Sequence, residues 1–209
     1  MSDEVKSTNF NGMTLPKWKI ISCTAPDEWA LKRKKYDAAS AQHQASREAL
    51  SLLLKEEGIE ISAYEIELEN FSKVKGLPQH VISLSHTSPH FAAAVIGENN
   101  IFKSVGVDLE KSDRKMKINS GHHFLNEADD PSLHQDLLRG WCKKEAAFKA
   151  WAPFWDDEKE GKPFILKDLD IRGELFFRKG SEVSLGQVKL LETNHEGQAL
   201  YLTLAWVLI

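Results

Sequence analysis

The sequence predicts an α+β protein built from two similar halves, each with one long helix and a small antiparallel sheet. Each half of the 209-residue chain holds one long segment of strong helix composition and several short β-type segments. These segments do not alternate as βαβ units would, which argues against a parallel sheet. Hydrophobic residues make up 42% and charged residues 28% of the chain, as in ordinary globular proteins with a sizeable core. We expect an N-terminal half over residues 1–100 and a C-terminal half over residues 101–209.

The N-terminal half begins with a polar tail over residues 1–14 and a short β-type run over residues 18–23. Residues 27–35 follow as a turn or short helix that ends in a dense basic cluster, KRKK, at residues 32–35. Residues 37–57 have strong helix composition, and Gly58 is well suited to end that helix. The apolar positions of this helix fall on one stripe: Ala45, Ala49, Leu52 and Leu53.

Three further strands are expected before the midpoint of the chain. Residues 59–68 alternate between apolar and polar and indicate one strand. Residues 81–84 and 91–96 are β-branched or small apolar runs, which indicates two strands joined by a turn over residues 85–89 (SHTSP). Residues 97–100 (GENN) read as the next turn.

The C-terminal half opens with a strand over residues 104–110 (SVGVDLE), in which apolar and other residues alternate. We expect a polar loop over residues 111–120, a short helix over 122–128, and a long helix over 132–151 that begins at Ser132. Pro153 then prevents the helix from continuing. The rest of the chain is β-like, with strands expected over residues 164–171, 174–177, 187–192 and 200–208.

Composition excludes several classes of function. The net charge of −4 provides no general positive field for nucleic acid or an anionic membrane, so we expect neither partner. The two cysteines, Cys23 and Cys142, lie far apart and match no zinc or disulfide pattern. The first residues lack an apolar signal core, and the longest apolar stretch, residues 199–209, is too short to span a bilayer. We therefore expect a cytoplasmic protein.

Three acids are candidate metal ligands. Asp108 and Glu110 lie on one face of their strand, with Cα atoms about 6.6 Å apart. Glu145 is a third acid on the long helix, between Trp141 and Phe148 on the same face. Carboxylates held together need a cation, or one of them must stay protonated. Mg²⁺ would resolve the repulsion and leave coordination positions for phosphate oxygens. For an isolated Asp-x-Glu pair, a solvated polar face would be the preferred interpretation.

Several lysines and one turn could contact phosphate. Lys149 follows Glu145 by four residues and Lys144 is adjacent to it, although a Glu–Lys pair at this spacing also occurs on ordinary surface helices. The turn containing Ser85 and His86 could hold a phosphate, or its hydroxyls could simply bond to their own backbone. The sequence has no nucleophile elbow, P-loop or HExxH motif.

Taken together, these segments resemble the 4′-phosphopantetheinyl transferases. The resemblance rests on SLSHTS (residues 83–88), GVDLE (106–110) and WCKKEAAFKA (141–150), in this order. It covers roughly residues 40–150, and the length is similar to that of the longer, surfactin-synthetase-activating type, a monomer of two similar halves. Two departures occur: Thr87 replaces a serine of the turn, and the usual Gly-Lys-Pro is scrambled within residues 73–78 (KVKGLP).

The resemblance implies an enzyme that moves the phosphopantetheine arm of coenzyme A onto a serine of an apo carrier protein and releases adenosine 3′,5′-bisphosphate. The active site would lie between the halves. The implied magnesium ligands are Asp108, Glu110 and Glu145. The implied catalytic residues are Glu145, as the base, with Lys144 and Lys149 beside the transferred phosphate. The implied coenzyme A contacts are Ser85, His86, Lys73, Lys75 and Arg47, with residues 32–35 as further candidates.

The same resemblance places the carrier protein near the loop over residues 111–120, whose basic residues would complement an acidic carrier helix. A mobile polar loop with no partner is the alternative interpretation of that segment. Two other functions remain open at this point. One is a coenzyme A-binding protein of the same fold with impaired catalysis, and the other is a magnesium-dependent hydrolase of pyrophosphates.

Overall fold

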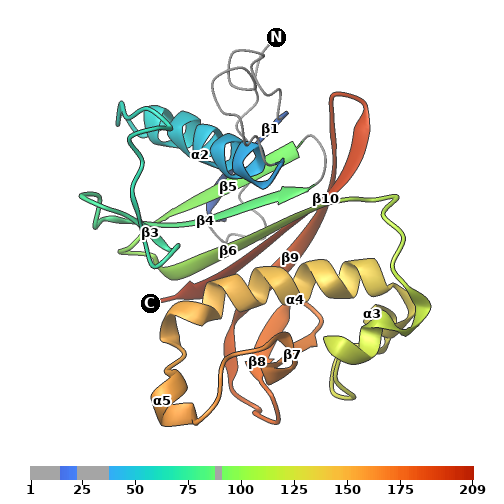
Figure 1. Cartoon of the computed structure of the whole chain (residues 1–209). Coiled ribbons are helices and arrows are strands. Elements are labelled where there is room, and N and C mark those ends of the chain that lie inside the picture. Colours follow the sequence, from blue (N-terminus) through green and yellow to red (C-terminus); the bar gives the residue numbers. More distant parts are fainter. Residues whose placement is uncertain (1–14, 23–37, 88–90) are drawn as a thin grey trace.

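The computed structural model describes residues 15–22, 38–87 and 91–209 and has a mixed α+β architecture with antiparallel sheets (Figure 1). The expected tail, the basic segment over residues 27–35 and Cys23 lie outside the described residues. No helix among the described residues has both the length and the apolar character needed to cross a membrane.

The N-terminal half contains a three-stranded sheet in the order β1-β5-β4, with every pair antiparallel. Its strands are β1 (Lys17–Ser22), β4 (His80–Thr87) and β5 (Phe91–Glu98). Helix α2 (Ala38–Glu56) packs across this sheet (Figure 1). Its fully buried stripe meets Ile82, Ala94 and Ile96 of the sheet. The prediction that Leu52 belongs to this stripe is wrong, because its side chain is 38% exposed on the outer face of the helix. The stripe comprises Ala49, Leu50, Leu53 and Leu54.

A two-stranded hairpin connects α2 to β4. It pairs β2 (Leu68–Glu69) with β3 (Lys73–Val74). The expected strand over residues 59–68 is therefore wrong except at its last residue. Residues 59–67 instead form turns and irregular chain whose apolar side chains Ile59, Ile61 and Ile66 pack against the α2 core. Apolar and polar residues alternate in this segment because only some of its side chains are buried against α2.

The C-terminal half contains a five-stranded antiparallel sheet in the order β6-β10-β9-β8-β7. The strands are β6 (Phe102–Lys111), β7 (Leu169–Arg172), β8 (Leu175–Arg178), β9 (Ser184–His195) and β10 (Gln198–Leu208). Helix α4 (Leu137–Trp151) packs across β6, β10 and β9 (Figure 1). Gly106 permits this close packing, because a Cβ at that position would lie 2.0 Å from the Ala146 carbonyl oxygen.

The two sheets meet where β4 runs beside β6, and side chains rather than a backbone ladder join them. The Val107 N–H donates to Ser83 Oγ at 3.2 Å, and the Leu109 N–H donates to Ser85 Oγ at 3.2 Å. One buried apolar cluster extends from Trp18 and Val95 in the first sheet to Val107 and Leu202 in the second. The halves therefore share a continuous core.

The connections around α4 differ from the sequence prediction. The expected helix over residues 132–151 is two helices, α3 (Pro131–Gln135) and α4, because the chain turns at Asp136. The Asp136 side chain accepts the Arg139 N–H at 3.1 Å and caps the new helix. The short helix expected over residues 122–128 is wrong as placed, since the helical turn is η1 (Ile118–His123), within part of the expected loop.

Short elements follow α4: η2 (Ala152–Phe154), α5 (Asp157–Glu160) and η3 (Leu166–Asp168). The strand expected over residues 164–171 therefore begins only at Leu169. The remaining strand predictions, over residues 18–23, 81–84, 91–96 and 104–110 and in the C-terminal tail over 174–177, 187–192 and 200–208, are confirmed to within a few residues.

Candidate functional site

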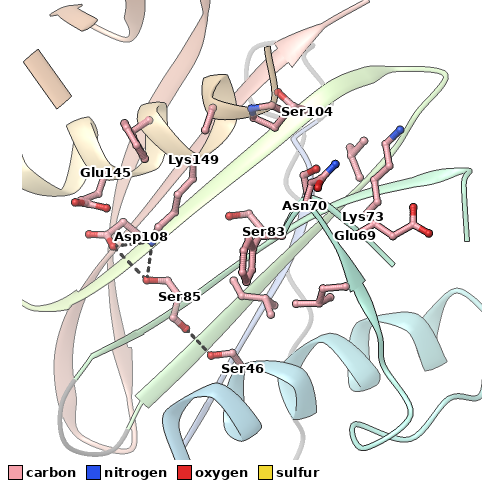
Figure 2. A pocket seen from close by; sticks show the side chains of 18 of the residues that line it. Ser46, Glu69, Asn70, Lys73, Ser83, Ser85, Ser104, Asp108, Glu145 and Lys149 are labelled. Atoms are coloured by element: carbon pink, nitrogen blue, oxygen red, sulfur yellow. Dashed lines mark hydrogen bonds and ion pairs between the residues drawn. The ribbon is translucent and has the colours of Figure 1, made fainter. Parts of the chain in front are cut away.

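A cavity of about 1020 Å³ lies at the junction of the two halves. Residues of α2, the β2–β3 hairpin, β4, β6, α4 and η2 line it, so both halves contribute (Figure 2). It brings together eight of the residues predicted from the sequence: Arg47, Lys73, Ser85, His86, Asp108, Glu110, Glu145 and Lys149. The three predicted acids therefore share one cavity.

Asp108 is at the centre of a hydrogen-bond network between β4, β6 and α4. Its Oδ1 accepts the Ser85 hydroxyl at 3.1 Å and lies 3.3 Å from Lys149 Nζ. Lys149 Nζ also donates to the Val107 carbonyl oxygen at 2.9 Å. The Asp108 side chain is 5% exposed, and within the described structure its Oδ2 is buried without a hydrogen-bond partner. A buried carboxylate oxygen without a partner is costly, which points to a ligand at this atom.

Glu110 is held by groups from two directions. The Thr87 hydroxyl donates to its Oε2 at 2.9 Å, and Arg114 pairs with its Oε1. The Arg114 guanidinium also lies 5.9 Å from the centre of the Trp141 ring. Ser85 and Thr87 lie two residues apart on β4, as Asp108 and Glu110 do on β6, and point to the same side of their strand. Ser85 thus faces Asp108, and Thr87 faces Glu110.

Ser85 and His86 belong to strand β4 and not to a turn, which corrects the sequence prediction. His86 lies edge-on to His43, with ring centres 5.2 Å apart. Burial lowers the pKa of His86 below its ordinary value, and the nearby His43 and Lys149 lower it further. The imidazole is therefore mainly neutral at pH 7 and lines the cavity as an uncharged hydrogen-bonding group.

Glu145 projects from α4 toward Asp108 (Figure 2). Burial raises the pKa of Glu145, and the charge of Asp108 adds to this increase, while Lys149 opposes it. A carboxylate that is costly to ionise gains from a cation that enters the cavity, and it also has increased affinity for a proton. Glu145 therefore has the character of a ligand or a base.

We expect Glu145→Gln to stabilise the metal-free protein at neutral pH, by an amount within the 0.5–2 kcal/mol typical of stabilising substitutions. Because the folded-state pKa of Glu145 is raised, the folded protein loses stability as pH rises from the unfolded-state pKa through the folded-state pKa. The gain should disappear at a pH below the unfolded-state pKa, where Glu145 is protonated in both states. Urea unfolding at several pH values in the presence of a chelator measures this, and a destabilised variant at pH 7 would contradict it.

The donor set of the cavity suits a hard divalent cation. Asp108, Glu110 and Glu145 offer only oxygen ligands, and Asp108 Oδ2 is unpartnered in the described structure. The described residues contain no group of three or more His, Cys, Asp or Glu side chains already close enough to hold a metal. The acids would thus need small side-chain movements, such as release of Glu110 by Arg114, to share an ion.

The upstream basic residues separate into two groups. Arg47 and Lys73 line the cavity, whereas Lys75 does not and instead pairs with Glu67 at 2.7 Å on the exposed surface. The structure adds Lys103 and His43 to the lining. No sequence signal marked these two, because their approach to the site depends on how β6 and α2 pack against β4.

Lys144 lies outside the cavity lining, which corrects its predicted role beside a transferred phosphate. Its side chain is completely buried and points away from the cavity, with Nζ 2.8 Å from Asp129 Oδ2 and also donating to the Leu169 carbonyl oxygen. Asp129 in turn accepts the Asn126 and Ile171 N–H groups, each at 2.6 Å. Lys144 therefore joins α4 to the segment before α3 and to β7.

Cys142, one helical turn before Ala146, is fully buried near Asp108. Burial raises the pKa of its thiol well above the ordinary value, and Asp108 adds to the increase. The thiol therefore stays protonated and is a poor nucleophile.

No protein-family model matches the chain, and no curated protein matches it significantly.

Proposed function

We propose that this protein is a 4′-phosphopantetheinyl transferase, which moves the phosphopantetheine arm of coenzyme A onto a serine of an apo carrier protein. The observation that carries the proposal is that Asp108, Glu110 and Glu145, from a strand and a helix far apart in sequence, line one cavity together with Lys149. The motif residues of β4, β6 and α4 thus occur together in space as the sequence resemblance requires. The proposal includes magnesium as cofactor, a monomeric protein and a cytoplasmic location.

The topology of the halves supports the proposed pseudo-dimer of similar units. Apart from the β2–β3 hairpin, the N-terminal half runs β1, α2, β4, β5 and has the strand order β1-β5-β4. The C-terminal half runs β6, α4, β9, β10, apart from short insertions, and contains the strand order β6-β10-β9. In both, the last strand is central, the first strand flanks it, and the one long helix packs on the sheet. The cavity lies at the junction of the two halves.

The cavity residues suit the chemistry of phosphoryl transfer. The serine oxygen of the carrier attacks the phosphorus that carries the pantetheine arm. The bond from this phosphorus to the oxygen of adenosine 3′,5′-bisphosphate breaks, and the serine proton passes to the Glu145 carboxylate, directly or through water. Lys149 stabilises the negative charge on the transferred phosphate, because its ammonium lies at the Asp108 side of the cavity. When bound at Asp108, Glu110 and Glu145, Mg²⁺ would neutralise charge on the diphosphate.

The remaining polar residues fit the coenzyme. Ser85 and the neutral His86 lie beside the acids and would bond to phosphate oxygens. Arg47 and Lys73 carry charge farther along the cavity and would contact the 3′-phosphate of the adenosine. Lys75 and Lys144 are not included in the proposed site, since each has an acidic partner elsewhere.

The carrier protein would approach the end of β6. Arg114 contacts Glu110 there, and the following segment carries Lys115 and Lys117 before η1. An acidic helix of the carrier would complement these charges and place its serine near Glu145.

The test is incubation of the protein with coenzyme A, Mg²⁺ and a panel of apo carrier proteins, followed by mass spectrometry. We expect a mass gain of one phosphopantetheine group on at least one carrier, and no gain when Mg²⁺ is removed by a chelator. A carrier in which alanine replaces the acceptor serine is the matched control. Absence of modification on every carrier, with coenzyme A bound, would contradict the transferase and favour the alternative below.

The second candidate is a coenzyme A-binding protein with impaired catalysis. The observation that favours it is the ion pair of Arg114 with Glu110, which occupies one of the three acids. In the first candidate Arg114 must leave Glu110 when Mg²⁺ binds. Calorimetry of coenzyme A binding with and without Mg²⁺, beside the transfer assay, separates the two functions.

A further inference from the structure

The tip of the β2–β3 hairpin holds an aromatic residue in an unfavourable backbone conformation. Asn70 and Phe71 have φ values of 49° and 55°, and the Ser72 N–H donates to the Glu69 carbonyl oxygen at 3.1 Å. The turn over residues 69–72 therefore has positive φ at both central positions, where Asn-Gly is strongly preferred, and it lies within the three-residue connection between Glu69 and Lys73. Asn70 fits the first position, but a phenylalanine at the second is strained where glycine would not be.

The ring of Phe71 gains nothing from core packing that would offset this strain. Phe71 is 84% exposed, yet it lines the cavity at the junction of the halves. The tip is also held in place, because the Ser72 carbonyl oxygen accepts the Ile82 N–H at 2.9 Å and so connects the hairpin to β4. Local strain at a fixed position beside a cavity is typical of a functional residue.

Three cations line the same cavity as the hairpin tip. Lys73 follows two residues later, directly opposite Glu69 in the hairpin, and Figure 2 shows both at the same end of the cavity as Asn70. Arg47 and Lys103 line the cavity as well. In the described part of the chain, none of these three cations forms an ion pair. An exposed ring and unpaired cations that line one cavity suit a ligand that joins a flat base to phosphate groups.

We propose that Phe71 stacks on the purine base of the bound nucleotide while Lys73 and its neighbouring cations hold the phosphate of that nucleotide. This inference rests on the proposed function, which makes the adenosine bisphosphate part of coenzyme A the ligand. It assigns recognition of the base to a residue outside the three motifs. The strain at Phe71 is then offset by the contact that the ring makes with ligand.

The experiment compares wild type with Phe71→Gly, Phe71→Tyr and the control Tyr64→Ala, an exposed aromatic residue outside the cavity lining. Calorimetry measures the Kd for adenosine 3′,5′-bisphosphate, for coenzyme A and for 4′-phosphopantetheine, which has no base. We expect Phe71→Gly to weaken binding of the two base-containing ligands about tenfold or more, because stacking on a base contributes about 1–3 kcal/mol. Phe71→Tyr should bind within about twofold of wild type, and 4′-phosphopantetheine should bind equally to all variants.

A melting experiment on the same proteins separates stacking from damage to the fold. Phe71→Gly should melt higher than wild type, by about 2–4 °C for each kcal/mol of strain relieved, since glycine suits a positive φ. Weaker nucleotide binding in a more stable protein supports the inference. A Phe71→Gly protein with unchanged Kd for adenosine 3′,5′-bisphosphate overturns it, even if that variant has a higher KM for the carrier protein.

The outcomes also distinguish this inference from the proposed function. If wild type transfers phosphopantetheine and Phe71→Gly binds nucleotide equally well, the inference fails and the function stands. If wild type transfers nothing but binds adenosine 3′,5′-bisphosphate in a Phe71-dependent manner, the function fails and the inference stands. If wild type binds neither ligand, both fail.

Discussion

Asp108→Asn is expected to lower the rate of phosphopantetheine transfer by about 10²–10³-fold, the loss typical when one preorganised electrostatic group is removed. Asp108 is the acid most fully enclosed by the proposed site, with Ser85 and Lys149 on Oδ1 and no partner on Oδ2 in the described structure. Asparagine keeps the shape and can still accept the Ser85 hydroxyl, but it removes the charge that would attract a divalent ion. Single-turnover transfer to an apo carrier at saturating coenzyme A measures the effect.

The matched control is Asp113→Asn, which removes the same charge from an exposed position outside the cavity lining. It should transfer at the wild-type rate. Mn²⁺ binding in the presence of coenzyme A, followed by electron paramagnetic resonance, gives a readout that does not depend on turnover. We expect Asp108→Asn to weaken Mn²⁺ binding and Asp113→Asn to leave it unchanged. Transfer by Asp108→Asn within about twofold of wild type would remove Asp108 from the metal site.

Local periodicity was sufficient to predict how the main site residues are oriented. Alternation along β6 places Asp108 and Glu110 on one face because successive strand residues point in opposite directions. Helical spacing places Glu145 and Lys149 on one face of α4 because residues four apart are neighbours. Both inferences need only the geometry of a single element, and both acids of β6 line the same cavity as the two α4 residues.

Local geometry could not decide which of two nearby lysines, Lys73 or Lys75, reaches the cavity. Lys73 and Lys75 lie on the same side of an extended chain, yet only Lys73 lines the cavity, because the hairpin turn at Asn70 and Phe71 sets the direction of β3. His43 and Lys103 likewise reach the cavity through packing between elements. Such long-range arrangements depend on the tertiary structure and leave no periodic signal in the sequence.

Two segments were predicted wrongly for identifiable reasons. The break between α3 and α4 falls at Asp136, which is a good N-cap residue within a segment of otherwise helical composition. The cap that Asp136 forms at the start of α4 therefore outweighs the tendency of the segment to continue as one helix. Residues 59–67 alternate like a strand but have no neighbouring strand to pair with, and they cover the end of the α2 core instead. In both cases the tertiary context decided between two locally acceptable structures.

Lys144→Met is expected to lower the free energy of unfolding by about 3–5 kcal/mol, the usual cost of removing one partner of a buried ion pair. Lys144 and Asp129 are both fully buried, with Nζ 2.8 Å from Oδ2. Methionine fills much of the same volume, but it leaves the Asp129 carboxylate without a cation and the Leu169 carbonyl oxygen without its donor. Burial already lowers the pKa of Lys144, which shows how strongly this location disfavours charge that lacks a partner. Urea unfolding followed by circular dichroism measures the loss.

Lys143→Met is the matched control, since it removes the same charge from the adjacent helix position, where the lysine donates only to the exposed Gly173 carbonyl oxygen. It should lower the free energy of unfolding by less than about 1 kcal/mol. The double variant Lys144→Met/Asp129→Asn should recover part of the loss, because the unpaired charge is then removed as well.

A Lys144→Met protein with wild-type stability and a large loss of transfer would return Lys144 to the catalytic role that its position beside Glu145 in the sequence first indicated. A destabilised protein that retains its transfer rate below its melting temperature would support a structural role for Lys144, which anchors α4 to Asp129 and β7 away from the cavity.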